Sequence, residues 1–211
     1  MDFFEQRQEM VERQLIPRGI TDPLVLEAMR TVPRENFVPD DLKDLAYNDG
    51  TLPIGEGQTI SQPYMVAKMV ELLKLKGGEK VLEVGAGSGF EAAVIAECVS
   101  EVITMDRLGP LVALARSNLK KAGYENIKVI KGDGTLGYQE EAPYDGIIVA
   151  AGAPKVPQPL LDQLAVGGRL VIPVGDRALQ KVIIINNDNG NYVESYSDGC
   201  IFVPLVGQEG W

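Results

Sequence analysis

The spacing of apolar residues changes near residue 80 of the 211-residue chain. Before that point, apolar positions recur at helical spacing, which predicts helices over residues 3–16, 23–31 and 63–73. The intervening stretch 32–55 is broken by prolines and reads as irregular. The segment LPIGEGQTISQPY, residues 52–64, is expected to be a polar, glycine-bearing loop that leads into a buried helix.

From Lys80 onward, short apolar runs alternate with helical patterns. Such alternation predicts parallel strands with helices on both faces of one sheet. Near the end, Asn189-Gly190 separates two strand-like runs, which is the signal of a tight antiparallel hairpin. The predicted strands cover 80–85, 101–106, 126–133, 144–151 and 167–175, and the predicted helices cover 89–99, 109–123 and 157–166.

The expected fold is therefore α/β and Rossmann-like, with a mostly parallel sheet that finishes in a C-terminal antiparallel hairpin. We expect a single domain over residues 1–211. Within it, residues 1–60 would form an N-terminal helical addition with the loop, and residues 61–211 would form the core.

A glycine turn, VLEVGAGSGF, joins the first core strand to its helix. Glycines at 85, 87 and 89 allow a ligand to approach the backbone closely. The third glycine comes one residue too early for the pyrophosphate-binding pattern G-x-G-x-x-G. Glu83 precedes the turn, and an acid there suits a cationic or amino-acid-bearing ligand. Asp106, at the end of the second strand, is placed to accept hydrogen bonds from ribose hydroxyls.

Composition narrows the chemistry further. The net charge is −10 and the basic residues are scattered, so nucleic acid is not expected as a partner. The chain has no histidine, which excludes histidine triads, histidine bases and histidine metal sites, and no metal is expected. Cys98 and Cys200 lie far apart, and no apolar run is long enough for a membrane span. The acidic, amphipathic N-terminal segment is unlike a signal peptide. We therefore expect a cytoplasmic protein.

The E-x-G-x-G-x-G turn resembles motif I of S-adenosylmethionine-dependent methyltransferases. A closer resemblance, from about residue 9 to residue 207, is to the protein-L-isoaspartate O-methyltransferase family. The segments that carry it are VPRENFVP, LPIGEGQTISQPYMVAKM, VLEVGAGSGFEAAVIAE, GDGTLGY, APYDGIIV and FVPLVG. The TISQPY segment is much more specific than the glycine turn.

The resemblance implies a methyltransferase Rossmann sheet with S-adenosyl-L-methionine as cofactor and S-adenosyl-L-homocysteine as product. The methyl group would go to the free α-carboxylate of L-isoaspartyl residues in damaged proteins and peptides. The ester would then collapse to a succinimide, whose hydrolysis returns some normal aspartate. A carboxylate is already ionised at neutral pH, so this reaction suits a chain without histidine.

The resemblance also implies roles for particular residues. Ser61 is the candidate catalytic side chain, although from the residues alone Thr59 or Ser61 could equally cap the following helix. Thr59, Ile60, Val203, Pro204 and Leu205 are implied substrate contacts. The implied cofactor-binding residues are Glu83, Gly85, Ala86, Gly87, Ser88, Gly89, Asp106, Arg107, Asp133 and Gly134.

Three residues depart from the family pattern. Asp106 stands where many relatives have glutamate, Tyr138 where tryptophan is frequent, and Ile201 where arginine is frequent. Three other functions share some of these features. A methyltransferase for small molecules would share the cofactor site but is disfavoured by TISQPY and FVPL. The glycine spacing disfavours a nicotinamide-dependent oxidoreductase, and the intact loop disfavours a non-catalytic binding protein. A monomer is favoured, although nothing in the sequence fixes the oligomeric state.

Overall fold

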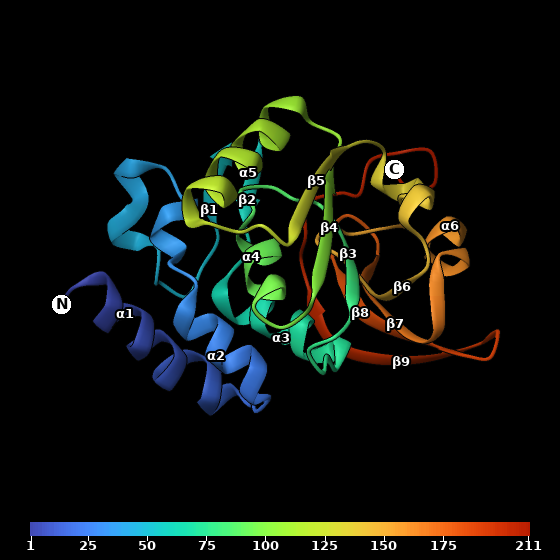
Figure 1. The fold of residues 1–211 in the computed structure, drawn as a ribbon, viewed down its shortest axis with the longest axis horizontal. Helices are drawn as coiled ribbons and strands as arrows, with labels where there is room; N and C mark the ends of the chain where they lie inside the picture. Colours follow the sequence, from blue (N-terminus) through green and yellow to red (C-terminus); the bar gives the residue numbers. More distant parts are fainter.

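A seven-stranded sheet forms the centre of the protein (Figure 1). The computed structural model describes residues 1–211, apart from the side chain of residue 198. The strand order is β5-β4-β3-β6-β7-β8-β9. The strands are β3 (Lys80–Val84), β4 (Glu101–Asp106), β5 (Ile127–Lys131), β6 (Tyr144–Val149), β7 (Leu164–Gly175), β8 (Gln180–Asp188) and β9 (Asn191–Cys200).

The strands from β5 to β7 pair in parallel, as the alternating pattern predicts. β8 pairs antiparallel with both β7 and β9, so the antiparallel part begins one strand earlier than a single terminal hairpin would require. The β8–β9 turn has Asn189 at φ 51° and Gly190 at φ 87°, the left-handed conformations that a tight hairpin demands.

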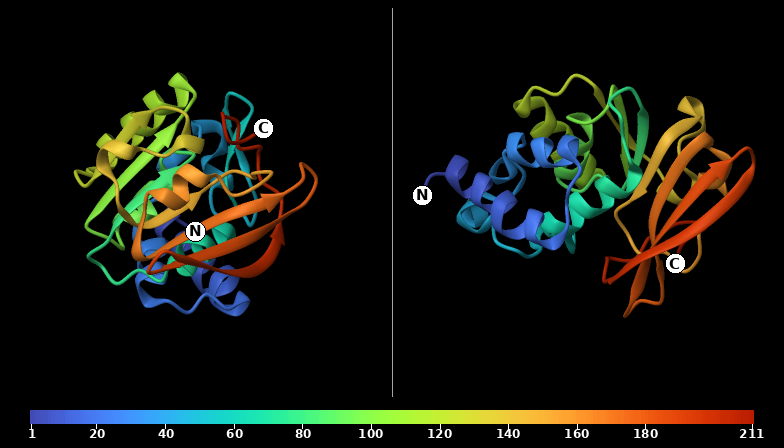
Figure 2. Two further views of the ribbon diagram at one scale, coloured as in Figure 1. Left: turned by 90° about the vertical axis from the view of Figure 1, so that its right-hand side faces the viewer. Right: turned by 90° about the horizontal axis from the view of Figure 1, so that it is seen from below.

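Helices cover both faces of the sheet and build a separate layer at one end (Figures 1 and 2). The N-terminal helices lie at the opposite end of the molecule from β7, β8 and β9 in the right-hand view of Figure 2. The helices are α1 (Phe3–Met10), α2 (Pro23–Thr31), α3 (Pro63–Leu73), α4 (Phe90–Ala96), α5 (Gly109–Ala122) and α6 (Gln158–Asp162).

The predicted first helix is less regular than its apolar spacing suggests. After α1 the chain continues as a π-helical turn, Val11–Leu15, and a 3₁₀ turn, Ile16–Arg18. Gly19, at φ 89°, then ends the segment. Pro17 has no backbone N–H and cannot continue an α-helix, which explains the tightening of the last turn.

The largest departure from expectation is in residues 52–60, which form a hairpin and not an irregular loop. β1 (Leu52–Gly55) pairs antiparallel with β2 (Gln58–Ile60). Glu56 and Gly57 form the turn at φ 52° and 69°. Gly57 therefore serves a tight turn, where a left-handed backbone favours glycine. Its strands are only four and three residues long, too short for an alternating pattern to show in the sequence.

The buried core joins the N-terminal helices to one face of the sheet. One apolar cluster includes residues of α1, α2, α3 and α4 with strand residues such as Val81 and Val102. A second cluster fills the other face, beneath α6, and includes Leu82, Ile103 and Leu160. None of the helices in the described part of the chain has both the length and the apolar character needed to span a bilayer.

Candidate active site

A cavity opens where the parallel strands β3, β4 and β6 end. The space inside it, including open solvent at the mouth, is about 960 Å³. This edge of an open parallel sheet is where such folds bind their ligands. The predicted residues that line the cavity are Thr59, Ile60, Ser61, Gly85, Ala86, Gly87, Ser88, Asp106, Arg107, Gly134, Val203, Pro204 and Leu205.

The glycine turn after β3 forms the floor of this cavity. Gly85 and Gly87 have φ values of 108° and 52°, which disfavour any other residue. A Cβ atom on Gly85 would lie 3.3 Å from the Cβ of Ala150, and one on Gly87 would lie 3.2 Å from Cδ1 of Ile54. Ile54 belongs to β1, so the hairpin lies directly over the turn.

Asp106 is held at the mouth of the cavity by backbone donors. The N–H of Gly87 donates to its Oδ2 at 3.1 Å, and the N–H of Leu108 donates to its Oδ1 at 3.0 Å. These bonds tie the end of β4 to the glycine turn. They also fix the carboxylate beside Ser88 and Arg107 in the cavity wall, where a bound ribose could share it.

Two segments far apart in the sequence face each other across the cavity. One is the end of β2 with Ser61, and the other is the stretch 203–206 near the C-terminus. In the left-hand view of Figure 2, the β1–β2 hairpin and this C-terminal stretch lie next to each other. The C-terminal stretch is anchored by two backbone bonds of 2.8 Å, from Gly152 N to Val203 O and from Leu205 N to Gly152 O.

Ser61 lies between β2 and α3, half-buried in the cavity wall. The N-cap of α3 is Gln62, and within the described part of the chain no side chain caps this helix end. The capping role that the sequence left open for Thr59 or Ser61 is therefore not adopted. The Ser61 carbonyl accepts a 2.8 Å hydrogen bond from Nη2 of Arg34, a side chain with no solvent exposure.

Three predicted cofactor residues do not line the cavity. Glu83 is fully buried on β3, and its Oε2 accepts a hydrogen bond from the Thr104 hydroxyl. Gly89 packs against α5, where an added Cβ would lie 3.0 Å from Cγ of Leu119. The Asp133 carboxylate receives the N–H groups of Thr135 and Gln208.

The physical reason for these placements is local. Glu83 lies on a fully buried strand, and its side chain is bonded to Thr104 on the neighbouring strand β4. Around Asp133, burial opposes ionisation, but donors from Gln208 and Thr135 outweigh it and lower the pKa of the carboxyl. Asp133 thus orders the C-terminal segment that flanks the site, and a direct contact with the cofactor remains a prediction.

Two candidate functional residues, Glu91 and Arg34, are not among those predicted from the sequence. Glu91, on α4, lines the cavity although it is only 8% exposed. Its signal was available, since it is an acid inside the apolar run FEAAVIA. Arg34 gave no such signal, because its partners Ala46 and Ser61 are twelve and twenty-seven residues away.

The residues present fit S-adenosylmethionine. A backbone turn that tolerates close approach, an oriented carboxylate for hydroxyl groups and an acidic side chain in the wall match its polar parts. Apolar wall residues such as Met105, Leu108 and Leu111 provide a surface suited to an adenine ring.

Comparisons with known proteins agree with this geometry. A family model described as protein-L-isoaspartate(D-aspartate) O-methyltransferase (PCMT) matches residues 5–210. A protein-L-isoaspartate O-methyltransferase of Methanoregula boonei is 52% identical, over 98% of this chain and 95% of its own. One of Marinobacter nauticus, named protein-L-isoaspartate O-methyltransferase 2, is 54% identical, over 100% of this chain and 97% of its own.

Two solved structures extend the likeness to the fold. A protein-L-isoaspartate O-methyltransferase superposes with a TM-score of 0.85 at 28% identity, covering 98% of this chain and 67% of that one. A Plasmodium falciparum protein, described as a putative member in complex with S-adenosyl-L-homocysteine, gives 0.80 at 28% identity, covering 95% and 98%. The sequence, the fold and the cavity therefore agree, and this chain belongs to the protein-L-isoaspartate(D-aspartate) O-methyltransferase family.

Proposed function

We propose that Ser61 orients the substrate as this enzyme transfers a methyl group from S-adenosyl-L-methionine to the α-carboxylate of an L-isoaspartyl residue. The overall activity is that of the family to which the chain belongs. The observation that carries the role of Ser61 is its placement. It lies in the cavity wall, and its hydroxyl is not used to cap α3.

The reaction requires little proton transfer by the protein. The substrate carboxylate is ionised at neutral pH and attacks as it stands. When bound, the cofactor supplies an electrophilic methyl group. The chain itself contributes alignment and exclusion of water, and such a proximity effect can lower the barrier by as much as ~7–11 kcal/mol.

The other proposed residues lie on two opposite sides of the cavity, one for the cofactor and one for the peptide. We propose that the turn from Gly85 to Ser88, with Asp106 and Arg107, contacts the cofactor, that Glu83 and Gly89 support this turn from behind, and that Asp133 and Gly134 border the adenine. The opposite wall would hold the damaged peptide through Thr59, Ile60 and the stretch 203–205. In support, the two walls come from β2 and from the anchored C-terminal segment.

Replacing Ser61 with alanine tests this role. We expect the turnover number to fall roughly tenfold or more, because a misplaced carboxylate no longer lies in line with the methyl group. The dissociation constant of S-adenosylmethionine, measured by calorimetric titration, should change little. A matched control is Ser100→Ala, whose hydroxyl donates to the carbonyls of Gly78 and Glu79. The control should lose some stability and keep its turnover. A Ser61→Ala enzyme that behaves like this control would remove Ser61 from the mechanism.

We further propose that the protein works in the cytoplasm as a monomer. Its two cysteines are free and buried, which suits a reducing compartment. Sedimentation of the purified protein at micromolar concentration tests the oligomeric state, and a stable dimer would contradict the second half of the proposal.

A further inference from the structure

Glu91 is an acidic side chain in the cavity wall for which the known reaction supplies no role. It lies on α4, the helix that follows the glycine turn, and every other residue of that helix is apolar. It is 8% exposed, and in the described structure its Oε1 atom has no hydrogen-bond partner. An unpartnered buried carboxyl oxygen costs stability, so a ligand that satisfies it is the natural explanation.

A second buried carboxyl group lies behind it. Glu83 on β3 has no solvent exposure, and only one of its oxygens is bonded, to the Thr104 hydroxyl. Burial raises the pKa of Glu91 to about 8. Burial also raises the pKa of Glu83, and the charges of Glu91 and Asp106 raise it further. The two carboxyl groups therefore interact, and their burial favours protons on the pair.

Charged groups on the elements around α4 do not neutralise this pair. Of them, Asp106 acts on Glu83 and adds negative charge. The Arg34 guanidinium lies 4.7 Å from the Phe90 ring centroid, but its hydrogen bonds go to the carbonyls of Ala46 and Ser61. The other charged side chains on elements that pack against α4 are Glu27 and Arg30 on α2, Lys68 and Glu71 on α3, Glu101 on β4, and Lys128 and Lys131 on β5.

We propose that Glu91, backed by Glu83, binds the positively charged methionine end of S-adenosylmethionine, and that binding releases a proton from the pair to the solvent. The cofactor carries positive charge on its sulfonium and on its ammonium group. Either cation beside Glu91 would stabilise the ionised carboxylate that burial disfavours. The proposal uses the family's cofactor but does not depend on the role of Ser61.

Proton release provides a signal that is separate from activity. With a pKa of about 8, Glu91 would be protonated in roughly nine of ten molecules at pH 7. Titration calorimetry in phosphate and in Tris, which differ in ionisation enthalpy, counts the protons released on binding. We expect close to one proton per S-adenosylmethionine for the native enzyme.

Three ligands identify the cation responsible. S-adenosylmethionine carries both cations, S-adenosylhomocysteine carries only the ammonium, and 5′-methylthioadenosine carries neither. Release with the first two ligands identifies the ammonium as the partner, and release with the first alone identifies the sulfonium. Either result supports the proposal. Release with 5′-methylthioadenosine as well, or with none of the three, overturns it.

The matched variants are Glu91→Gln and Glu97→Gln. Both lie at α4, but Glu97 is exposed at its C-terminal end. Glu91→Gln should abolish proton release and weaken S-adenosylmethionine binding by roughly ten- to a hundredfold, the effect of losing a charged hydrogen bond. Glu97→Gln should bind and release protons as the native enzyme does. Unchanged proton release in a folded Glu91→Gln protein would refute the proposal.

Discussion

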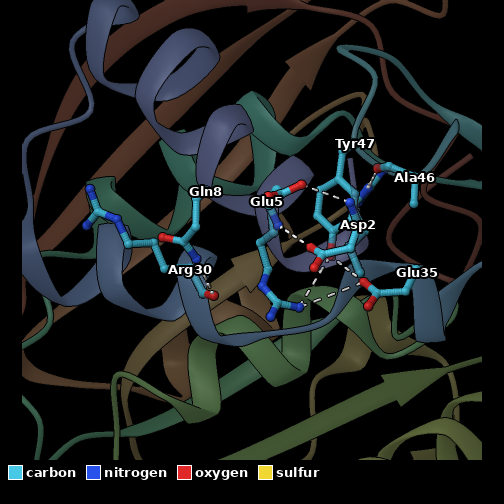
Figure 3. A network of polar contacts seen from close by, with 9 residues as sticks. Asp2, Glu5, Gln8, Arg30, Glu35, Ala46 and Tyr47 are labelled. Carbon is cyan, nitrogen blue, oxygen red and sulfur yellow. Dashed lines mark hydrogen bonds and ion pairs between the residues drawn. The ribbon is translucent and has the colours of Figure 1, made fainter. Parts of the chain in front are cut away.

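Arg34 offers a sharp test of how the fold holds the catalytic segment. Its side chain is fully buried, with Nε 2.7 Å from the Ala46 carbonyl and Nη2 2.8 Å from the Ser61 carbonyl. Burial lowers the pKa of the guanidinium to about 9, so it stays charged at neutral pH. Figure 3 shows Ala46 next to Tyr47, whose hydroxyl donates a hydrogen bond to Glu35.

The change Arg34→Met keeps much of the volume and removes the charge and the donors. Two backbone carbonyls then lose partners, each at a cost of ~1–3 kcal/mol. The stacking of Arg34 on the Phe90 ring, worth ~0.5–2 kcal/mol, is also lost. Burying a positive charge costs free energy, so removing the guanidinium offsets part of this loss of stability. We therefore expect the free energy of unfolding to fall by ~2–4 kcal/mol.

The same change should slow methyl transfer, because the Ser61 backbone loses its anchor. Urea denaturation measures the stability, and single-turnover transfer to an isoaspartyl peptide measures the chemistry. Arg169→Met is the matched control, since Nη1 of Arg169 donates to the Leu72 carbonyl at 3.0 Å and Arg169 does not line the cavity. The control should lose stability and keep its transfer rate. If the Arg34→Met protein kept the native stability and transfer rate, the hydrogen bonds of Arg34 would not stabilise the fold or the Ser61 segment.

Three further predictions concern the cofactor wall and its surroundings. Asp106→Ala should weaken S-adenosylmethionine binding by ~1–3 kcal/mol, and unchanged affinity by calorimetry would exclude the ribose contact. Gly134→Ala should lower the thermal midpoint by several degrees, because the new Cβ would overlap Cγ1 of Val84; a native midpoint by scanning calorimetry would refute that packing. Since the pKa of Glu91 is about 8 in the fold and 4.5 as a free side chain, the folded state binds more protons between these values. Stability of the ligand-free enzyme should fall as pH rises through that window, by ~1.4 kcal/mol per unit. Urea denaturation at several pH values should show this slope reduced in Glu91→Gln, and equal slopes would contradict the shift.

Local patterns predicted the core of the fold well. The alternation from Lys80 onward and the Asn189-Gly190 turn depend on neighbours in the chain, and both are present. The family and its cofactor also followed from contiguous motifs. Burial on both faces made the central strands β3, β4 and β6 largely apolar, which is why their pattern was clear.

Features that depend on tertiary contacts could not be predicted in the same way. The β1–β2 hairpin is too short for a periodic signal, and it is placed by Ile54 over Gly87. The early end of α6 at Asp162 follows from β7, which starts already at Leu164. The Arg34 anchor joins residues that no spacing rule connects.

Selectivity for the isoaspartyl linkage is the most direct test of the account. Both isomers of a peptide present a carboxylate of similar pKa, so charge cannot distinguish them. Only the position of the carboxylate relative to the peptide backbone differs, and a misplacement of about 1 Å can cost ~10²-fold in rate.

The measurement is transfer of labelled methyl groups from S-adenosylmethionine to an isoaspartyl peptide and to its aspartyl twin. We predict that kcat/KM for the isoaspartyl peptide is higher by at least roughly 10²-fold. Comparable methylation of the two peptides would contradict the repair function and favour a general carboxyl methyltransferase.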